Sequence, residues 1–172
     1  MNINVEKIFI SSCMVLLVVL NACSQAPSNG KIMPGSSEDA KTYPEAKPNT
    51  YWKKVLSPEA YDIMVNKGTE RPFHNPYWDN HEKGTYVSAA TGKPLFSSDA
   101  KFESGTGWPS FFKPIDPKAI MIVKDYSDGM ERDEVVERST GLHLGHVFDD
   151  GPAPTGLRYC LDSYALKFIK AK

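Results

Sequence analysis

One cysteine lies in the stretch RYCLDS near the C-terminus, between an arginine and an aspartate. If this stretch is an extended strand, Arg158, Cys160 and Asp162 lie on one face, because side chains alternate along a strand. The guanidinium favours a charged thiolate, and the carboxylate opposes it. These charged neighbours are unusual for a cysteine that is merely buried, and they suit a nucleophile.

The chain has three cysteines, Cys13, Cys23 and Cys160. Only Cys160 lies beyond residue 23. An unpaired cysteine in a folded domain is either a reactive thiol or a buried apolar side chain. The count alone favours burial, whereas the polar neighbours favour reactivity.

Two histidines occur in the stretch GLHLGHVF. In a straight strand His143 and His146 would point to opposite faces, but Gly145 can supply a bulge that brings both imidazoles to one side. As metal ligands they form a weak pair, because no third ligand has a useful spacing. They suit acid–base chemistry near a thiol, since histidine titrates near neutral pH. This motif alone is equally compatible with two structural histidines.

An aromatic cluster follows a glycine-rich turn in SGTGWPSFFKPI. Trp108 and Phe111 can be ordinary core residues, which is the commoner fate of aromatic side chains. They can also line a pocket for a methyl group bonded to sulfur, because both groups pack well against aromatic faces.

Several short elements must position these residues. Ser57 and Pro58 form a good start for one short helix, and Gly68 is a good stop. After it, Thr85–Ser88 reads as a strand, and residues 119–126 and 130–138 flank a turn and predict a hairpin. Residues 157–169 are expected to be extended. The predicted class is mainly β with a helical N-terminal edge.

The N-terminal region has the anatomy of an export signal. Lys7 is followed by an apolar run, residues 8–20, which is shorter than the roughly 20 residues of a membrane-spanning helix. The run ends in LNAC, which resembles the lipobox of bacterial lipoproteins. We therefore expect a signal peptide over residues 1–22, with Cys23 lipidated as the mature N-terminus. The alternatives are an uncleaved membrane anchor and an ordinary signal peptide.

Residues 23–50 are rich in proline and polar residues and predict a flexible tether. Residues 51–172 then form one domain, with 41% apolar residues in the whole chain. We expect an exported protein anchored in a membrane, the outer one in a Gram-negative cell. The 20 basic and 21 acidic residues exclude a charge-driven nucleic-acid binder. We expect a monomer.

Several separated blocks within residues 51–169 together resemble the type B methionine sulfoxide reductases, the MsrB family. The blocks occur in the family's order along the chain: GTERPF, YWDNHEKGTYVS, GKPLFSSDAKFESGTGWPSFFKPI, GLHLGHVFDDGPAPTG and RYCLDSYALKFI. The resemblance implies two antiparallel β-sheets in an open, barrel-like arrangement, with short N-terminal helices. It also implies reduction of the R epimer of protein-bound methionine sulfoxide.

The resemblance assigns roles to the residues above. Cys160 would attack the sulfoxide sulfur and become a sulfenic acid. His143 and His146 would position and protonate the sulfoxide oxygen, and Arg158 would lower the thiol pKa. Trp108 would hold the substrate methyl group. Phe111 and His81 are expected to complete the substrate pocket, with His81 at its rim.

The chain departs from the family at three places. Asp162 stands where asparagine is usual, so a carboxylate replaces an amide donor. Many relatives bind zinc through two C-x-x-C pairs, but the corresponding residues here are Ser88, Thr91, Glu137 and Thr140. We therefore expect no metal and no cofactor.

The third departure concerns regeneration. Some zinc-free relatives carry a recycling cysteine where this chain has Thr106. An external thiol, from a thioredoxin-like protein or a small molecule, must therefore reduce the sulfenic acid.

Two other functions compete with the reductase. The first is a non-catalytic lipoprotein that keeps the fold and binds oxidised or methionine-rich peptides. Asp162, in place of the usual asparagine, is the feature that supports this alternative. The second is a cysteine hydrolase that uses Cys160, His143 and Asp162. The second is disfavoured because nothing in the sequence suggests an oxyanion hole.

Overall fold

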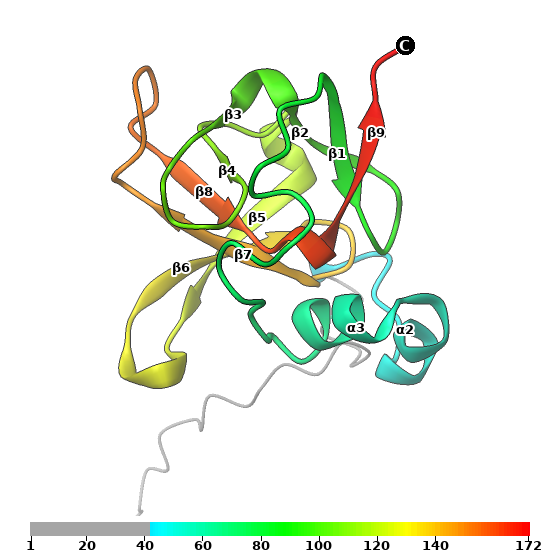
Figure 1. The fold of residues 1–172 in the computed structure, drawn as a ribbon. Coiled ribbons are helices and arrows are strands. Elements are labelled where there is room, and N and C mark those ends of the chain that lie inside the picture. Colours follow the sequence, from blue (N-terminus) through cyan, green and yellow to red (C-terminus); the bar gives the residue numbers. More distant parts are fainter. Residues whose placement is uncertain (1–41) are drawn as a thin grey trace, which may run out of the picture. The chain divides into compact units, whose positions relative to one another are not determined.

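The computed structural model describes residues 42–172, and these form a mainly β domain with two antiparallel sheets, as predicted (Figure 1). The three-stranded sheet has the order β2 (Pro94–Ser97), β1 (Gly84–Ser88), β9 (Leu166–Lys170). The six-stranded sheet has the order β3 (Lys101–Phe102), β4 (Ser110–Phe111), β8 (Arg158–Leu161), β7 (His143–Phe148), β6 (Arg132–Glu137), β5 (Ile120–Asp125). Among the described residues the sheets remain separate and form no closed barrel.

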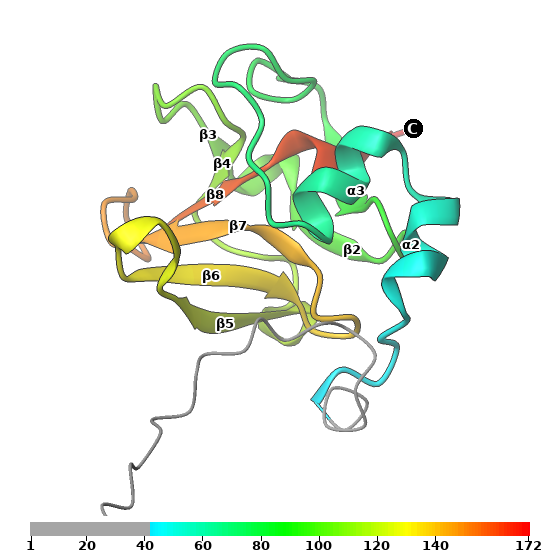
Figure 2. The same ribbon diagram turned by 90° about the horizontal axis from the view of Figure 1, so that it is seen from below.

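Two short helices precede the strands, α2 (Asn49–Val55) and α3 (Pro58–Met64) (Figure 2). The predicted start of α3 is confirmed, because the Ser57 side chain accepts a hydrogen bond from the backbone N–H of Ala60 at 3.1 Å. The helix ends at Met64, earlier than the expected stop at Gly68. Helix α2 was not predicted from the local sequence.

The core lies between the inner faces of the two sheets. Tyr86 and Phe96 of the three-stranded sheet pack against Phe111 of the six-stranded sheet, with ring centroids 5.0 and 4.8 Å apart. Leu144 and Leu161 are fully buried in the same cluster. Burying each large apolar side chain contributes about 1.5–3 kcal/mol, so this contact holds one sheet firmly on the other.

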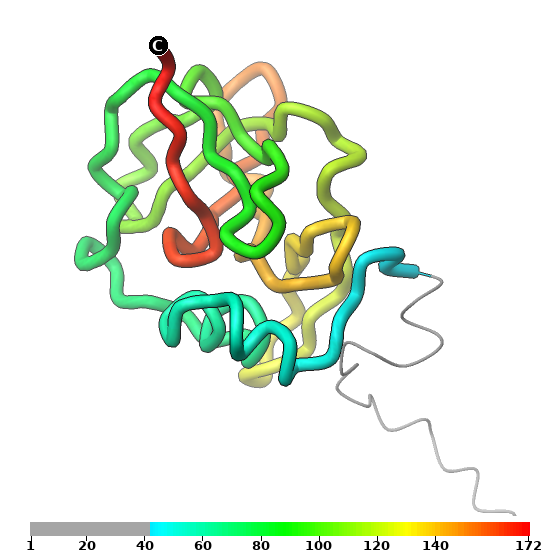
Figure 3. The backbone as a smooth tube through the Cα atoms, turned by 90° about the vertical axis from the view of Figure 1, so that its right-hand side faces the viewer, coloured from blue at the N-terminus to red at the C-terminus, as the bar shows by residue number. Residues whose placement is uncertain are grey.

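The C-terminal stretch supplies one strand to each sheet. Strand β8 ends at Leu161, a single turn Ser163–Ala165 changes the chain direction, and β9 then pairs with β1. Figure 3 shows this last strand running beside β1. The prediction that residues 157–169 are extended is therefore confirmed except at the turn.

The hairpin predicted around residue 128 is also present. Strands β5 and β6 pair in continuous antiparallel register from Ile120 opposite Glu137 to Asp125 opposite Arg132. Asp128 and Gly129 in the connecting turn have φ values of 56° and 71°. This hairpin forms one edge of the six-stranded sheet, and β7 continues it on the other side (Figure 2).

The folded part begins before the predicted boundary at Tyr51. The backbone N–H of Glu45 donates to the carbonyl of Ser139 at 2.7 Å, and the Tyr43 ring lies against Gly141. The C-terminal end of the predicted tether is thus packed on the domain. The predicted signal peptide and Cys23 lie outside the described residues. Over the described part of the chain, neither helix is long and apolar enough to span a bilayer.

Candidate active site

A row of four side chains crosses adjacent strands of the six-stranded sheet. Ser110 of β4 is opposite Cys160 of β8, Cys160 is opposite His146 of β7, and His146 is opposite Glu134 of β6. Directly opposed residues of antiparallel strands share a face, with Cβ atoms about 4.5–5.5 Å apart. Cys160 therefore lies between a hydroxyl group and an imidazole.

A β-bulge in β7 brings the second histidine to the same face. Val135 pairs with Gly145 and Val136 with His143, so Leu144 is the extra residue. The two imidazole rings lie 5.3 Å apart between centroids. Gly145 has φ +147°, and a Cβ there would lie 2.2 Å from the carbonyl oxygen of Cys160. The prediction that Gly145 brings both imidazoles together is confirmed.

His143 is held between two carboxylates in the protein interior. Its Nδ1 lies 2.7 Å from Glu134 and its Nε2 lies 3.5 Å from Asp162, with 3% of the histidine side chain exposed. Burial opposes the charged ring, but the bonds to Asp162 and Glu134 outweigh it and raise the pKa of His143. Lys67 pairs with the other oxygen of Glu134 at 2.7 Å, so each oxygen of this buried carboxylate has a partner.

His146 has the opposite electrostatic character. Its Nε2 lies 2.8 Å from Asp125, which also pairs with Arg132 at 2.9 Å. Burial lowers the pKa of His146, and the bond to Asp125 only partly offsets it. The surroundings therefore shift the two imidazoles in opposite directions, His143 toward the charged form and His146 toward the neutral form, an arrangement that separates an acid from a base.

Arg158 places a fixed positive charge beside the thiol. Its Nε and Nη2 donate to the two carboxylate oxygens of Asp150 at 2.8 and 2.9 Å. Its guanidinium also stacks over the Phe148 ring at 4.4 Å from the centroid. A bidentate pair of this kind fixes the orientation of the guanidinium as well as its position.

Cys160 is half-buried, and its sulfur is less acidic than the sequence suggested. Burial raises the pKa of the Cys160 thiol, while the charge of Arg158 and a hydrogen bond from Thr106 oppose the rise without cancelling it. Arg158 thus lowers the thiol pKa, as predicted, but its effect is smaller than that of burial. The thiol form dominates at neutral pH, so formation of the thiolate needs a base or further donors.

A backbone hydrogen bond holds the segment that carries Trp108 beside the strand that carries Cys160. The carbonyl of Pro109 accepts from the N–H of Leu161 at 3.0 Å, which places the residue after Trp108 beside the residue after Cys160. The half-buried indole donates its Nε1–H to the carbonyl of Glu70 at 3.2 Å. This bond fixes one edge of the ring, so the indole is a suitable wall for a small apolar group.

One predicted substrate contact, Phe111, does not fit this geometry, and the predicted rim position of His81 stays a prediction. Phe111 is 0% exposed and packs in the core, because the alternation of β4 turns Ser110 to the site and Phe111 to the opposite face. His81 is a surface residue with 65% of its side chain exposed, and its ring nitrogens lie near Asp79 and Glu103 at 2.9 and 3.7 Å. Its polar partners are surface carboxylates rather than groups of the site.

Several residues of the site were not predicted from the sequence. Glu134 and Asp125 hold the two histidines, and Asp150 holds the arginine. The role of Glu134 could have been predicted from the hairpin. Val135 faces the core, so alternation along the strand turns the Glu134 side chain to the opposite face. Asp125 is the last residue of β5, next to the turn of the same hairpin. Its contact with His146 therefore depends on the exact register of the strands.

The residues at the family's zinc positions form a hydrogen-bonded cluster, here called the Glu137 cluster. The buried carboxylate of Glu137 accepts from the hydroxyls of Ser88 and Thr140 at 3.0 and 2.9 Å, and also from that of Thr91. Zinc in structural sites prefers thiolate and imidazole ligands, so three hydroxyls and one carboxylate do not fit it.

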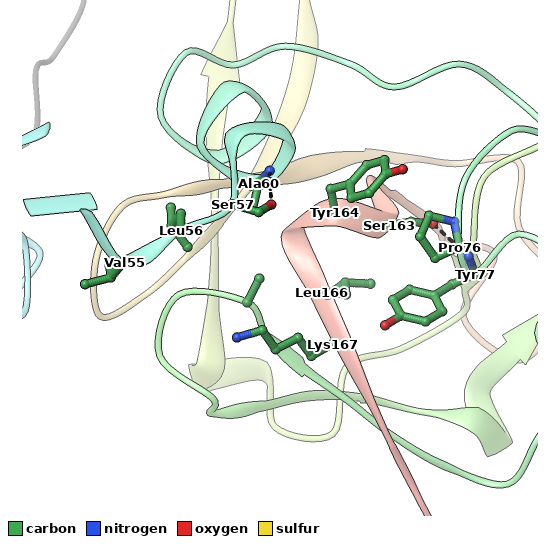
Figure 4. A pocket seen from close by; sticks show the side chains of 11 residues that line it. Val55, Leu56, Ser57, Ala60, Pro76, Tyr77, Ser163, Tyr164, Leu166 and Lys167 are labelled. Atoms are coloured by element: carbon green, nitrogen blue, oxygen red, sulfur yellow. Dashed lines mark hydrogen bonds between the residues drawn. The ribbon is translucent and has the colours of Figure 1, made fainter. Parts of the chain in front are cut away.

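A cavity of about 240 Å³ lies elsewhere, between α3, the start of β9 and the segment around Tyr77 (Figure 4). Ala60, Tyr164 and Leu166 are among the residues lining it. Its lining contains none of the predicted site residues. The chemistry of Cys160 therefore belongs to the face of the six-stranded sheet and not to this cavity.

Comparison with known proteins identifies the family. The SelR domain model matches residues 56–170. A protein of Leptospira interrogans named peptide methionine sulfoxide reductase MsrB is 56% identical over 119 residues, which cover 69% of this chain and 91% of that protein. Proteins of the same name from Methanosarcina barkeri and Thiobacillus denitrificans are 57% and 52% identical over 117 and 124 residues, covering 68% and 72% of this chain and 82% and 94% of those proteins.

The chain belongs to the MsrB family. The aligned region includes all the strands of the described domain, so the row from Ser110 to Glu134 and the bulge at Gly145 are parts of an MsrB domain.

Proposed function

We propose that this chain reduces the R epimer of protein-bound methionine sulfoxide, with Cys160 as the nucleophile. Membership of the MsrB family makes the chain a peptide methionine sulfoxide reductase. The observation that supports this assignment of the site is the position of Cys160, opposite His146 on one face, with Arg158 beside it and Trp108 nearby.

The first step transfers oxygen to the protein. Neutral His146 takes the thiol proton, and the Cys160 thiolate attacks the sulfoxide sulfur while the indole of Trp108 holds the methyl group. The sulfur–oxygen bond breaks, and His143 supplies the proton that the departing oxygen takes up. A bond then joins the Cys160 sulfur to the substrate sulfur. The protonated oxygen attacks the Cys160 sulfur, methionine leaves as the sulfur–sulfur bond breaks, and Cys160 keeps the oxygen as a sulfenic acid.

Asp162 orients His143 in this scheme. Its Oδ2 faces the imidazole Nε2, and its Oδ1 accepts from the backbone N–H of Glu70 at 3.4 Å. A carboxylate at this position stabilises the imidazolium that donates the proton. The carboxylate is thus compatible with catalysis, although it cannot donate the hydrogen bond that an amide would provide.

The second step needs an external thiol. Cys160 is the only cysteine of the chain beyond residue 23, and Thr106 occupies the position of a recycling cysteine. One external thiol attacks the sulfenic acid and releases water, and a second resolves the mixed disulfide and restores the Cys160 thiol. A thioredoxin-like protein or a small dithiol can supply both electrons. We further propose that no zinc takes part, because the donors of the Glu137 cluster do not suit it.

The decisive experiment measures turnover of a peptide containing either sulfoxide epimer, with dithiothreitol as the reductant. We expect the full-length chain to reduce the R epimer and leave the S epimer, and Cys160→Ser to lose at least about a thousandfold in rate. Equal rates in both proteins would refute the catalytic assignment and favour a peptide-binding role.

Regeneration is tested by sulfoxide treatment without reductant. We expect the wild-type protein to accumulate a sulfenic acid on Cys160 that dimedone traps. In Thr106→Cys, a second thiol lies next to the oxidised sulfur, and we expect a disulfide between residues 106 and 160 instead. An internal disulfide at Cys160 in the wild-type protein would contradict external regeneration.

Anchoring is a separate proposal. The LNAC sequence supports cleavage before Cys23, lipidation of this residue and export with the domain outside the cytoplasm. We expect labelled palmitate to enter the wild-type protein and not Cys23→Ser, and the variant to leave the membrane fraction. Equal labelling of both proteins would exclude Cys23 as the lipidation site.

A further inference from the structure

Three hydroxyl groups form a chain that ends at the sulfur of Cys160. Ser110 Oγ lies 2.8 Å from Ser104 Oγ, and Ser104 Oγ lies 2.8 Å from Thr106 Oγ1. Thr106 Oγ1 then lies 3.9 Å from Cys160 Sγ. Neither serine has a role in the mechanism above.

The hydrogen bonds of Ser104 set the direction of this chain. A hydroxyl group has one proton to donate and two lone pairs to accept. Ser104 Oγ accepts from Ser110 Oγ and, at 3.4 Å, from the backbone N–H of Thr106. Ser110 can donate its one proton to Ser104 Oγ or to the carbonyl of Trp108; when it donates to Ser104, both lone pairs of Ser104 Oγ are used and the Ser104 proton points to Thr106 Oγ1. Thr106 is left to direct its own proton to the sulfur.

The backbone holds the two ends of the chain in place. Ser110 is fully buried in β4, directly opposite Cys160, and its hydroxyl also lies 3.2 Å from the carbonyl of Trp108. Gly105 has φ +72°, which turns the backbone so that Ser104 and Thr106 lie close together. The donors therefore keep their positions when the charge on the sulfur changes.

We propose that Ser104 is a positioning residue that orients and polarises the Thr106 hydroxyl, so that it donates a hydrogen bond to the Cys160 thiolate, while Ser110 faces the sulfur from the adjacent strand and bonds to Ser104. Hydrogen bonds linked in one direction strengthen one another, and the thiolate is the acceptor at the end of the series. The proposal rests on the proposed function only in taking this thiolate as the reactive species. It adds a second means of stabilising the thiolate, alongside Arg158.

The test measures how readily Cys160 reacts with iodoacetamide over a range of pH. Mass spectrometry of the peptide containing residue 160 keeps the signal separate from Cys13 and Cys23 in the full-length chain. We expect Thr106→Val to slow alkylation about tenfold near neutral pH, because it removes a donor to a charged acceptor. Thr106→Ser keeps the donor and should restore most of the rate.

Ser104→Ala should slow the same reaction about threefold, because the Thr106 hydroxyl loses its polarising donor. In the Thr106→Val background the Ser104 substitution should have no further effect, since Ser104 acts only through the missing hydroxyl. Thr85→Val, in the other sheet, makes the same side-chain change away from the site and should react like the wild-type protein. Thermal unfolding of each variant checks that it is folded.

Two outcomes would overturn the proposal. An unchanged alkylation rate in Thr106→Val would show that its hydroxyl does not act on the sulfur. Equal slowing by Ser104→Ala in both backgrounds would show that Ser104 supports the loop and does not work through Thr106. Because alkylation involves no sulfoxide, loss of reductase turnover with an intact alkylation pattern would count against the proposed function alone.

Discussion

Asp162 affects both reacting centres, because its carboxylate faces His143 and lies close enough to Cys160 to influence its charge. Its negative charge raises the pKa of both groups. It therefore makes the acid easier to keep protonated and the nucleophile harder to form. An amide at this position would shift the balance toward the nucleophile.

We predict that Asp162→Asn speeds alkylation of Cys160 about threefold near neutral pH, because a like charge is removed from beside the thiolate. The same change lowers the pKa of His143, so the alkaline limb of the reductase pH profile should move to lower pH. Asp99→Asn, which removes a fully exposed carboxylate, should change neither property. Slower alkylation in Asp162→Asn would contradict this prediction.

Glu70 links the site to the rest of the domain. Its carboxylate accepts from the backbone N–H groups of Ser163 and Tyr164 at 2.5 and 3.0 Å. Burial raises the pKa of Glu70 from 4.5 to about 7, against the effect of these two hydrogen bonds. The native state therefore holds a proton that the unfolded state has lost between these two pH values.

The sign of the resulting pH dependence follows from this shift. The contribution of Glu70 to stability is fully present below pH 4.5 and is lost as the pH rises through about 7. We predict that the free energy of unfolding falls less between these values in Glu70→Gln than in the wild-type protein, by on the order of 2 kcal/mol. Urea unfolding at the two pH values measures the free energy of unfolding of both proteins. An equal change with pH in the variant and the wild type would exclude this role for Glu70.

At the level of elements, the bulge in β7 decides whether the site exists. Without the extra residue, His143 and His146 would lie on opposite faces. Gly145 permits the bulge because its backbone has φ +147° and because a Cβ at this position would overlap the carbonyl of Cys160. The absence of a side chain at Gly145 thus allows both the bulged backbone of β7 and the close packing of β7 on β8.

We predict that Gly145→Ala destabilises the domain by on the order of 3 kcal/mol or more, because the added Cβ meets backbone atoms and alanine is strained at this φ value. Gly156→Ala is the matched control, since Gly156 has φ +70° but open space around its Cβ position. The control should lose only about 1 kcal/mol. Similar urea midpoints for the two variants would contradict the steric argument.

The local sequence predicted those elements whose signals are short-range. The Ser57–Pro58 helix start, the β5–β6 hairpin and the alternation around Cys160 all depend on neighbours within a few residues. The bulge was predicted because a glycine separates two histidines of opposite parity. The contacts with Glu134 and Asp125 were not predicted, because they depend on strand register.

The same limit explains why Phe111 was wrongly predicted as a substrate contact and why the direction of His81 could not be predicted. An aromatic residue next to a site motif faces either the core or the substrate, and alternation along β4 decides this only when the strand boundaries are known. Phe111 faces the core because Ser110 faces the site. His81 lies in a loop, where no periodicity indicates its direction.

On the scale of the whole molecule, residues before Tyr51 belong partly to the folded domain. We predict that a chain beginning at Thr42 is more stable than one beginning at Tyr51, by about 1–2 kcal/mol. The shorter chain loses the hydrogen bond from Glu45 to Ser139 and the start of α2. Urea unfolding of the two truncated chains measures the difference, and equal midpoints would assign these residues to the tether.

The Glu137 cluster joins the two sheets, because Ser88 ends β1 and Glu137 ends β6. Under our proposal that no zinc takes part, this junction forms from the polypeptide alone. The domain would then mature even where chelators or competing proteins keep free transition metals scarce.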